Sequence, residues 1–307
     1  METPKQLVGQ KNDFIQKTVY KELNINDLKV FKAIVSKINY KDTLFDDFYT
    51  LDYNVLDLAG VNKNNRFNIV SAALKKLSGT FVKIKNEKGD TVELGLIKNK
   101  FVYEKGTTKI VVEVDEDLQP YLLDLKNKYT KYELENIKKF DNVYTLQIYE
   151  LLKSWESKGS FIHSLEQLKE YLNIPQDKYN PYNNFKRKIL DKAFDQINSE
   201  TDIFFSIEEI KVGRKVEKLR FIIMSKNDEV VEKDLTALID KVFVGKDKNK
   251  YLVLAYEKDK GSHKYKYKRF NIVKQEITYT PLLEKDELFD SVLEKIKVSE
   301  MSKKVSF

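Results

Sequence analysis

The chain contains no cysteine and only two histidines among its 307 residues. The absence of cysteine excludes disulfide bonds, zinc sites with thiolate ligands and iron–sulfur clusters. The two histidines, His163 and His263, lie in different regions of the sequence, so a metal site built from several histidines of one chain is excluded as well. We therefore expect a protein with no metal and no other cofactor.

Long apolar runs are also missing. No uninterrupted apolar stretch approaches the roughly 20 residues that cross a bilayer, and the polar N-terminus does not resemble a secretory signal. Hydrophobic residues make up 41% of the chain, which is enough for real cores, and the length suffices for two ordinary domains with an appendage. We expect a cytoplasmic protein that does not associate with membranes.

The positive charge of the chain does not by itself identify a partner. The formal net charge is +7 and the isoelectric point is near 9.0. Because charged residues make up 34% of the chain, most of them must be ordinary solvated surface. The clustering of the charge is therefore more informative than its sum.

The most informative pattern lies between residues 143 and 225. An amphipathic helical stretch opens it, and a second short helix, Ser164 to Leu172, begins with a capping box of Ser164 and Gln167. A turn rich in Asn, Pro and Asp follows, then a strongly basic helix from Tyr182 to Asn198, then two β-patterned segments. Helix, helix, turn, basic helix and hairpin in this order are typical of a winged helix that binds DNA.

The faces of the basic helix follow from its predicted start. Asn180 and Pro181 mark that start, because Asn caps free backbone N–H groups and Pro at the first helical position needs no donor. At about 100° per residue, the apolar side chains fall on one arc: Phe185, Ile189, Ala193 and Ile197, with Leu190 at its edge. Asn184, Arg187, Lys188 and Asp191 fall on the opposite side, whereas Lys186 lies near the apolar arc and would have to extend its stem past the helix.

This arrangement suits a helix in the major groove of DNA, where residues of the N-terminal half meet base edges. The guanidinium of Arg187 has the best shape for bidentate contact with guanine. We take Asn183 and Asn184 as candidates for adenine or phosphate, and Tyr182 as a residue that stacks, touches a thymine methyl or reaches a phosphate. The alternative interpretation is a solvated basic face on a core helix.

The predicted hairpin adds independent support. Apolar residues alternate from Ile203 to Ile207 and again from Leu219 to Ile223. Gly213, between these segments, allows the positive φ that a tight turn needs. Lys211, Arg214 and Lys215 surround that turn, where a wing meets the DNA backbone or the minor groove.

A weaker version of the same order occurs earlier in the chain. A short helix from Tyr53 to Ala59 ends at Gly60, a polar turn covers residues 62–65, and a longer helix carries Phe67 and other apolar residues. A hairpin is expected around residues 88–90. We interpret the two stretches as winged helices in tandem; a structure that lacks a helix-turn-helix and hairpin at residues 50–97 would contradict this.

Other segments support more limited predictions. Asn26 is a plausible N-cap for the first long helix, and residues 126–140 look like a connecting region that includes a helix. His163 has no neighbours that suggest catalysis, and we take it as a surface residue. Beyond Ser225 we expect a helix at residues 231–243, a strand at 251–256 and a helix at 282–296, and a run of basic and aromatic residues covers 264–269.

The same residues resemble a known family. The stretches Tyr144–Lys153 (YTLQIYELLK), Ser164–Lys169, Tyr182–Leu190 (YNNFKRKIL) and Ile197–Ile203 resemble the plasmid replication initiator (Rep) proteins of the initiator-Rep superfamily. The segments Lys211–Val216 and Leu219–Ile223 continue the resemblance, and Lys11–Asp13 resembles the opening of these proteins. The resemblance covers roughly residues 8 to 225 and is most specific in the second domain.

The resemblance implies an α+β fold of two tandem winged-helix domains. Residues 1–140 would form the first domain with a connecting region, residues 141–226 the main DNA-recognition domain, and residues 227–307 an extension of unknown role. It also implies binding of double-stranded origin repeats (iterons), origin opening, and recruitment of host proteins such as DnaA and the replicative helicase, without catalysis. Related proteins act as monomers at the origin and often as dimers that repress their own gene, with the first domain supplying most of the dimer contact.

By position, the resemblance assigns the main DNA-reading role to Asn184, Lys186, Arg187, Lys188 and the wing residues. In the first domain, Lys63, Asn64, Asn65 and Arg66 occupy the equivalent turn and helix start. Because that helix is less basic, we expect it to make more backbone contacts than base contacts.

Two other functions stay open on the sequence alone. A winged-helix transcriptional regulator without a role in replication would use the same DNA-binding residues. A rolling-circle nickase pairs a nucleophilic tyrosine with a metal that adjacent histidines hold; eighteen tyrosines are present, but paired histidines are not.

Overall fold

The computed structural model describes residues 5–85, 90–226, 242–244, 250–258, 265–271 and 276–280, together with residues 292 and 295. The chain divides into two units, residues 1–202 with 209–220, and residues 203–208 with 221–307. Within the described residues, every helix is too short or too polar to cross a membrane.

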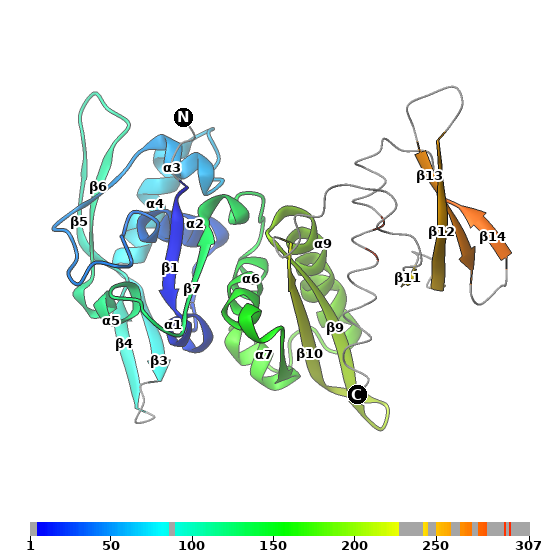
Figure 1. Ribbon diagram of the computed structural model, residues 1–307. Coiled ribbons are helices and arrows are strands. Elements are labelled where there is room, and N and C mark those ends of the chain that lie inside the picture. The colour runs from blue at the N-terminus through cyan, green and yellow to red at the C-terminus, as the bar shows by residue number, and fades with distance from the viewer. Residues whose placement is uncertain are drawn as a thin grey trace. The chain divides into compact units, whose positions relative to one another are not determined.

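The first winged helix is built around a buried helix, α2. Its elements are α2 (Ile25–Val35), β2 (Tyr49–Leu51), α3 (Tyr53–Leu58), α4 (Arg66–Ser78), β3 (Phe81–Lys85), β4 (Thr91–Gly95), β5 (Ile97–Tyr103) and β6 (Ile110–Val114). The predicted helix-turn-helix and the hairpin that follows are both present, with Phe81 opposite Gly95 in the hairpin (Figure 1). The predicted N-cap was wrong by two residues: Asn24, not Asn26, caps α2, because its side chain accepts hydrogen bonds from the N–H groups of Asn26 and Asp27.

Strand order shows which hairpin of the first domain corresponds to a wing. In the first domain the order is β2–β6–β5, and in the second it is β8–β10–β9. In both sheets the strand that precedes the helix-turn-helix therefore pairs with the last strand of a hairpin. The equivalent wing of the first domain is β5–β6, with its tip at residues 104–109, and β3–β4 is an additional hairpin inserted after α4. The sequence had indicated the inserted hairpin instead.

Two strands join the beginning of the first domain to its end. β1 (Leu7–Lys11) pairs antiparallel with β7 (Tyr129–Glu133), so Leu7 lies opposite Glu133. The connecting region was expected to include a helix, but its regular elements are this strand and a 3₁₀ turn, η2 (Leu134–Ile137). Three more short helices lie between β1 and β7: α1 (Asn12–Lys17), η1 (Glu116–Leu118) and α5 (Gln119–Leu122).

The second winged helix follows the predicted order. Its elements are α6 (Val143–Trp155), η3 (Glu156–Lys158), β8 (Ser160–Ser164), α7 (Leu165–Tyr171), α8 (Tyr182–Phe185), η4 (Lys186–Leu190), α9 (Asp191–Glu200), β9 (Ile203–Val212) and β10 (Lys215–Ser225). The Ser164–Gln167 capping box is confirmed. The basic helix starts at Tyr182, as predicted, but its N-cap is Pro181 and not Asn180. Asn180 instead accepts a hydrogen bond from Lys169 Nζ at 3.2 Å.

Helix α6 belongs to the cores of both domains. It packs against α1 and β7 of the first domain and against α9 of the second. Tyr149 is fully buried, with its ring edge-on to Phe140 and its hydroxyl donating to Asp202 Oδ1 at 2.8 Å. His163 is half-buried rather than exposed, edge-on to Phe161, and this burial lowers its pKa.

The extension contains an antiparallel sheet. Its strands are β11 (Val242–Val244), β12 (Lys250–Lys258), β13 (Tyr265–Asn271) and β14 (Glu276–Tyr279), in that order. The predicted strand at 251–256 is confirmed, and the basic and aromatic run lies mostly on β13. The predicted helix at 231–243 was wrong at its end, because residues 242 and 243 lie in β11. The rest of that helix, and most of the helix predicted at 282–296, lies outside the described residues.

Candidate nucleic-acid interface

The basic helix, residues 182–200, buries the apolar arc that its sequence predicts. Phe185, Ile189, Ala193 and Ile197 are buried, and so is Leu190. Residues 186–190 form a π-helical turn, which is wider than an α turn and lets two consecutive apolar residues face the core. Lys186, Arg187 and Lys188 lie exposed on this turn. The basic charge is thus concentrated on the solvent side of an irregular turn.

Arg187 and Lys188 are available to bind an anion. Arg187 is exposed and, within the described part of the chain, forms neither a hydrogen bond nor an ion pair. Lys188 Nζ lies 5.7 Å from the centre of the Tyr179 ring, a cation–π contact that leaves its charge unneutralised. Neither residue would have to break an ion pair in order to contact DNA.

Lys186 and Tyr182, in contrast, are held by a wing residue, Glu209. Lys186 Nζ lies 2.7 Å from Glu209 Oε1, and the Tyr182 hydroxyl donates to the same oxygen at 3.1 Å. The hydrogen bond from Lys186 lowers the pKa of Glu209, whereas burial, and then the Glu209 charge, raise the pKa of Tyr182. Glu209 was not predicted as a site residue, because a glutamate on a strand has no local feature that distinguishes it from surface charge.

Asn183 and Asn184, at the start of the basic helix, differ in how freely their side chains could contact DNA. Asn183 is exposed. Asn184 Nδ2 donates to the backbone oxygen of Asn180 at 2.9 Å, so its amide already ties the first turn to the preceding loop. Asn183 is the better placed of the two for a base or phosphate contact.

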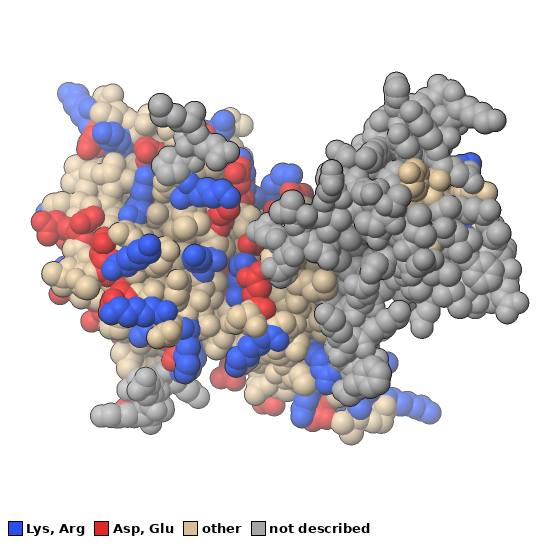
Figure 2. Space-filling view, viewed as in Figure 1, with Lys and Arg blue, Asp and Glu red and all other residues tan. Residues whose placement is uncertain are grey.

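The wing presents basic residues at its tip. Gly213 has a φ of +60°, the positive value that its turn was predicted to need. Lys211 Nζ lies 3.7 Å from Glu209 Oε2, whereas Arg214 and Lys215 form no ion pair or hydrogen bond among the described residues. Figure 2 shows blue side chains at the free end of the β9–β10 hairpin, at the lower right.

The predicted residues of the first domain are only partly accessible. Lys63 is exposed, with its Nζ 3.5 Å from Asp57 Oδ2. The Asn64 N–H donates to Asn62 Oδ1 at 2.8 Å. Asn65 has a φ of +60° at the N-cap of α4, and its side-chain oxygen accepts from Asn68. These contacts order the turn and leave the Lys63 ammonium as its main exposed cation.

Arg66 does not occupy the exposed position that its sequence suggested. Its side chain is only 7% exposed, pairs with Asp57 and donates to the Val61 carbonyl. The guanidinium also lies 4.9 Å from the centre of the Tyr53 ring. Arg66 therefore joins α3 to α4 inside the domain, and we remove it from the set of DNA contacts.

Several large apolar side chains of the first domain are exposed instead. Phe67, at the start of α4, is 51% exposed and lies 5.0 Å from the Tyr103 ring. Phe48 and Val102 are also about half exposed. Val102 pairs with Val111 across β5 and β6, and Lys100, on the same side of β5, reaches over the Phe48 ring at 5.7 Å. The surface made by Phe48, Val102 and Val111 is called the outer sheet face below.

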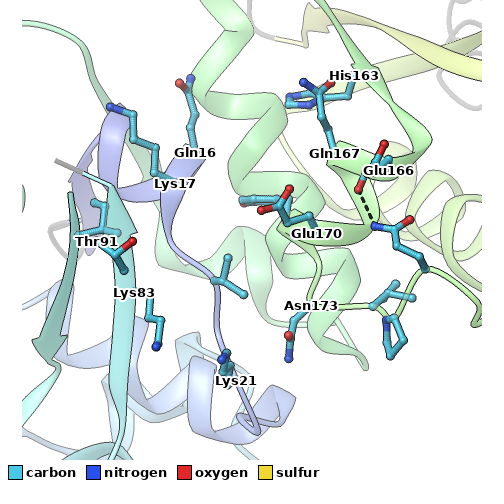
Figure 3. Close-up of a pocket in the computed structure, with 16 residues that line it drawn as sticks. Gln16, Lys17, Lys21, Lys83, Thr91, His163, Glu166, Gln167, Glu170 and Asn173 are labelled. Carbon is cyan, nitrogen blue, oxygen red and sulfur yellow. Dashed lines mark hydrogen bonds between the residues drawn. The ribbon is translucent and has the colours of Figure 1, made fainter. Parts of the chain in front are cut away.

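A cleft of about 910 Å³ lies beside α7. Figure 3 shows its two walls: Lys17, Lys21 and Lys83 from the first domain, and His163, Glu166, Gln167 and Glu170 from β8 and α7. Lys17 and Lys83 already pair with Asp13 and Glu93, at 2.8 and 2.7 Å. Among the described residues, groups of three or more potential metal ligands are absent.

Comparison with known protein families identifies the family to which the chain belongs. A family model described as Initiator Replication protein, WH1, matches residues 7–153, and one described as Initiator Rep protein, WH2, matches residues 164–223. The chain belongs to the plasmid replication initiator family. Its fold of two tandem winged-helix domains agrees with the fold that the sequence predicted.

Curated relatives agree with this assignment. The chain is 33% identical over 131 residues to the PI protein of Escherichia coli, which covers 36% of this chain and 42% of that protein. It is 26% identical over 170 residues to a replication initiation protein of Escherichia coli, covering 53% and 52% of the two chains. The chain thus spans about half the length of the curated relatives that it matches.

Proposed function

We propose that this chain is a non-catalytic initiator that binds double-stranded origin repeats (iterons) of a plasmid in the cytoplasm. The observation that carries the proposal is the pair of unneutralised cations, Arg187 and Lys188, on a helix beside a basic wing, in a member of the replication initiator family. Origin opening and recruitment of host proteins such as DnaA and the replicative helicase follow as the further steps of the proposal.

In this proposal the basic helix enters the major groove with Arg187 on a guanine and Asn183 on a neighbouring base or phosphate. The ion pair of Lys186 with Glu209 holds the helix start against β9, at 2.7 Å between Nζ and Oε1. That contact sets the angle between helix and wing before DNA arrives. Arg214 and Lys215 then meet the backbone beside the groove, and Tyr182 supports the arrangement through Glu209.

The first domain makes the weaker DNA contact in this proposal. Lys63 and the ordered turn at Asn64 and Asn65 offer a charge and backbone N–H groups to phosphates. With Arg66 buried in its pair with Asp57, this surface lacks a side chain suited to bidentate base recognition.

Self-association is assigned to the outer sheet face. Val102, on the edge strand β5, and Phe48, directly before β2, are about half exposed, and such an apolar surface favours contact with another protein. A second copy of the chain on this face gives the dimer, which would repress expression of its own gene while the monomer acts at the origin.

Titration of duplex DNA by gel shift or fluorescence anisotropy tests the proposal. The expected result is tighter binding to cognate origin repeats than to random duplex of equal length at moderate salt, with a preference of about 10³-fold or more. Equal affinity for both duplexes would refute sequence-specific initiation. A plasmid-maintenance assay separates an initiator from a transcriptional regulator, because only the initiator is required for the plasmid to persist.

A further inference from the structure

A carboxylate and an ammonium lie buried where α6 meets the first domain. Glu150, on α6, is 1% exposed, and Lys32, on α2, is 0% exposed. Lys32 Nζ lies 2.7 Å from Glu150 Oε1. Charges this deep in a protein are uncommon unless they are paired, because each loses its hydration.

The surrounding side chains satisfy both charges. Gln10 Nε2 and the Tyr132 hydroxyl each donate to Glu150 Oε1 at 2.7 Å. Lys32 Nζ donates in turn to Gln10 Oε1 at 2.9 Å and to the Tyr20 hydroxyl at 3.3 Å. Burial lowers the pKa of Lys32, and the Glu150 charge opposes that change. We call these five residues the Glu150 cluster.

The cluster draws on five separate segments of the chain. Its residues come from β1, the loop before α2, α2 itself, β7 and α6. Only one rotation of α6 about its axis lets Glu150 contact Lys32, Gln10 and Tyr132 at once, because hydrogen bonds require both distance and direction. An apolar contact at the same place would tolerate several rotations.

The residues of α6 on either side of Glu150 form hydrogen bonds with the second domain. The Tyr171 hydroxyl, at the end of α7, donates to the Gln147 backbone oxygen at 3.1 Å, and both residues are buried. Asp202, just before β9, accepts from Tyr149 and Lys153, at 2.8 and 2.9 Å. Helix α6 therefore transmits its position against the first domain directly to the helix-turn-helix of the second.

A buried ion pair adds little to stability compared with a well-packed apolar pair, because desolvation offsets the attraction between the charges. The hydrogen bonds of the cluster are directional, however, and therefore define the orientation of α6. We propose that Glu150 is a positioning residue for DNA recognition: the Glu150 cluster fixes α6 in one rotation and so aligns the DNA-contacting surfaces of the two winged helices. This inference rests on the proposed function, since alignment matters only where both domains meet one duplex.

The test replaces the ion pair by an apolar pair. In the full chain, Lys32→Met with Glu150→Leu removes both charges together and keeps the volume similar, so that no charge is left buried without its partner. Because Gln10 and Tyr132 lose their acceptor, thermal stability is expected to fall moderately while the protein stays folded. Affinity for origin repeats should nevertheless fall about tenfold, and the hydroxyl-radical footprint should shrink to the part covered by the second domain. Affinity for random duplex should stay unchanged.

The exposed pair of Lys5 and Glu133 supplies a matched control. Its Nζ–Oε1 distance is 2.6 Å and its side chains are 70% and 42% exposed, next to Tyr132 on β7. Lys5→Met with Glu133→Leu removes the same charges and should leave both affinity and footprint as in the wild type. If the double variant of the cluster does not fold, Tyr132→Phe removes one hydrogen bond to Glu150 at nearly constant volume and should weaken repeat binding several-fold.

The outcomes distinguish failure of the positioning role of Glu150 from failure of the proposed function. A stable double variant, or a Tyr132→Phe variant, with wild-type affinity and footprint overturns the positioning role. A wild-type footprint that covers only one winged helix overturns it too, since no second surface would then need alignment. If the wild type itself fails to prefer repeats over random duplex, the proposed function fails first, and the inference falls with it.

Discussion

At the scale of single residues, the side chains around the basic helix differ in what DNA binding would cost them. Arg187 can bind DNA without giving up an existing interaction, because it has no partner among the described residues. Lys186 would have to leave Glu209, from which it is separated by 2.7 Å, before it could neutralise a phosphate. Neighbouring cations on this helix therefore differ: Arg187 is free to contact an anion, whereas Lys186 already supports the contact between helix and wing.

Replacement of Arg187 tests base recognition. Arg187→Ala should weaken repeat binding by about 1–3 kcal/mol, because the variant cannot bind guanine in a bidentate manner, and should relax the preference at one base position. Lys192→Ala, an exposed cation farther along the same helix, is the control and should have a much smaller effect. Anisotropy titrations against repeats with single base substitutions measure both. A uniform decrease in affinity over all sequences would show that Arg187 contacts only the backbone.

The wing residues should behave differently. Lys215→Ala should weaken binding to repeats and to random duplex alike, because a phosphate contact carries no sequence information. The slope of log K against log salt should become shallower by about 0.9 for each phosphate that the variant no longer neutralises. A titration series in potassium chloride gives the slope, and an unchanged slope would mean that the tip does not touch DNA.

His163 predicts a pH dependence of stability. Burial lowers its pKa in the folded state, so below the ordinary histidine pKa, about 6.5, the unfolded chain binds a proton that the folded chain does not. This contribution to stability is therefore lost as pH falls from the unfolded pKa towards the folded one. Thermal unfolding at pH 7.5 and 5.5 should show a larger decrease for the wild type than for His163→Gln. Equal decreases would contradict the burial of the imidazole.

At the scale of elements, the two winged helices share a strand order but differ in chemistry. The β9–β10 wing carries basic residues at its tip, whereas the first domain exposes Val102 on β5 and Phe48 directly before β2. The same architecture therefore presents charge in one domain and apolar surface in the other. This difference is the physical basis for assigning DNA reading to the second domain and self-association to the first.

The outer sheet face provides a prediction at this scale. Val102→Lys should shift the protein towards monomer, because a charge would be buried without a partner in any dimer formed there. Phe81→Lys is the control: Phe81 is 60% exposed but lies on the separate β3–β4 hairpin. Sedimentation velocity over a range of protein concentrations measures the change. If both variants associate like the wild type, the dimer uses another surface.

At the scale of the whole molecule, the proposed function, DNA binding without catalysis, can be tested against the nickase. The chain has two histidines and no cysteine, and the described residues hold no group of three potential metal ligands. Incubation of supercoiled origin DNA with the protein and Mg²⁺ or Mn²⁺ should leave it without nicks, as seen on agarose gels. Metal-dependent relaxation that requires one tyrosine would support the nickase that the sequence left open.

Much of the fold was predictable because its causes are local. The capping box at Ser164, the apolar arc that begins at Phe185 and the glycine turn at Gly213 each depend on residues a few positions apart. β1 and β7 were missed, since their partners lie more than a hundred residues apart and neither strand has a distinctive alternation. The π turn at residues 186–190 also has no sequence pattern of its own.

The residues of the candidate site also include some that the sequence predicts and others that it does not. The exposed basic side of the helix and the basic wing tip could be predicted from periodicity, and Lys186 was already recognised as lying near the apolar side. The buried position of Arg66 could not be predicted from the sequence. Its partner Asp57 belongs to the preceding helix, and only the packing of α3 against α4 brings the two residues together. The role of Glu209 likewise depends on the contact between a helix and a strand.

By itself, the sequence determined two helix-turn-helix units, a basic helix, a basic wing and the absence of a thiolate or multi-histidine metal site. These features follow from composition and from the spacing of neighbouring residues. Only the tertiary structure decided that β5–β6 is the equivalent wing of the first domain, that Arg66 is internal, and that Glu150 joins α6 to the first domain. Each of these depends on a partner distant in sequence, and such partners are selected by packing and hydrogen-bond geometry after the local elements have formed.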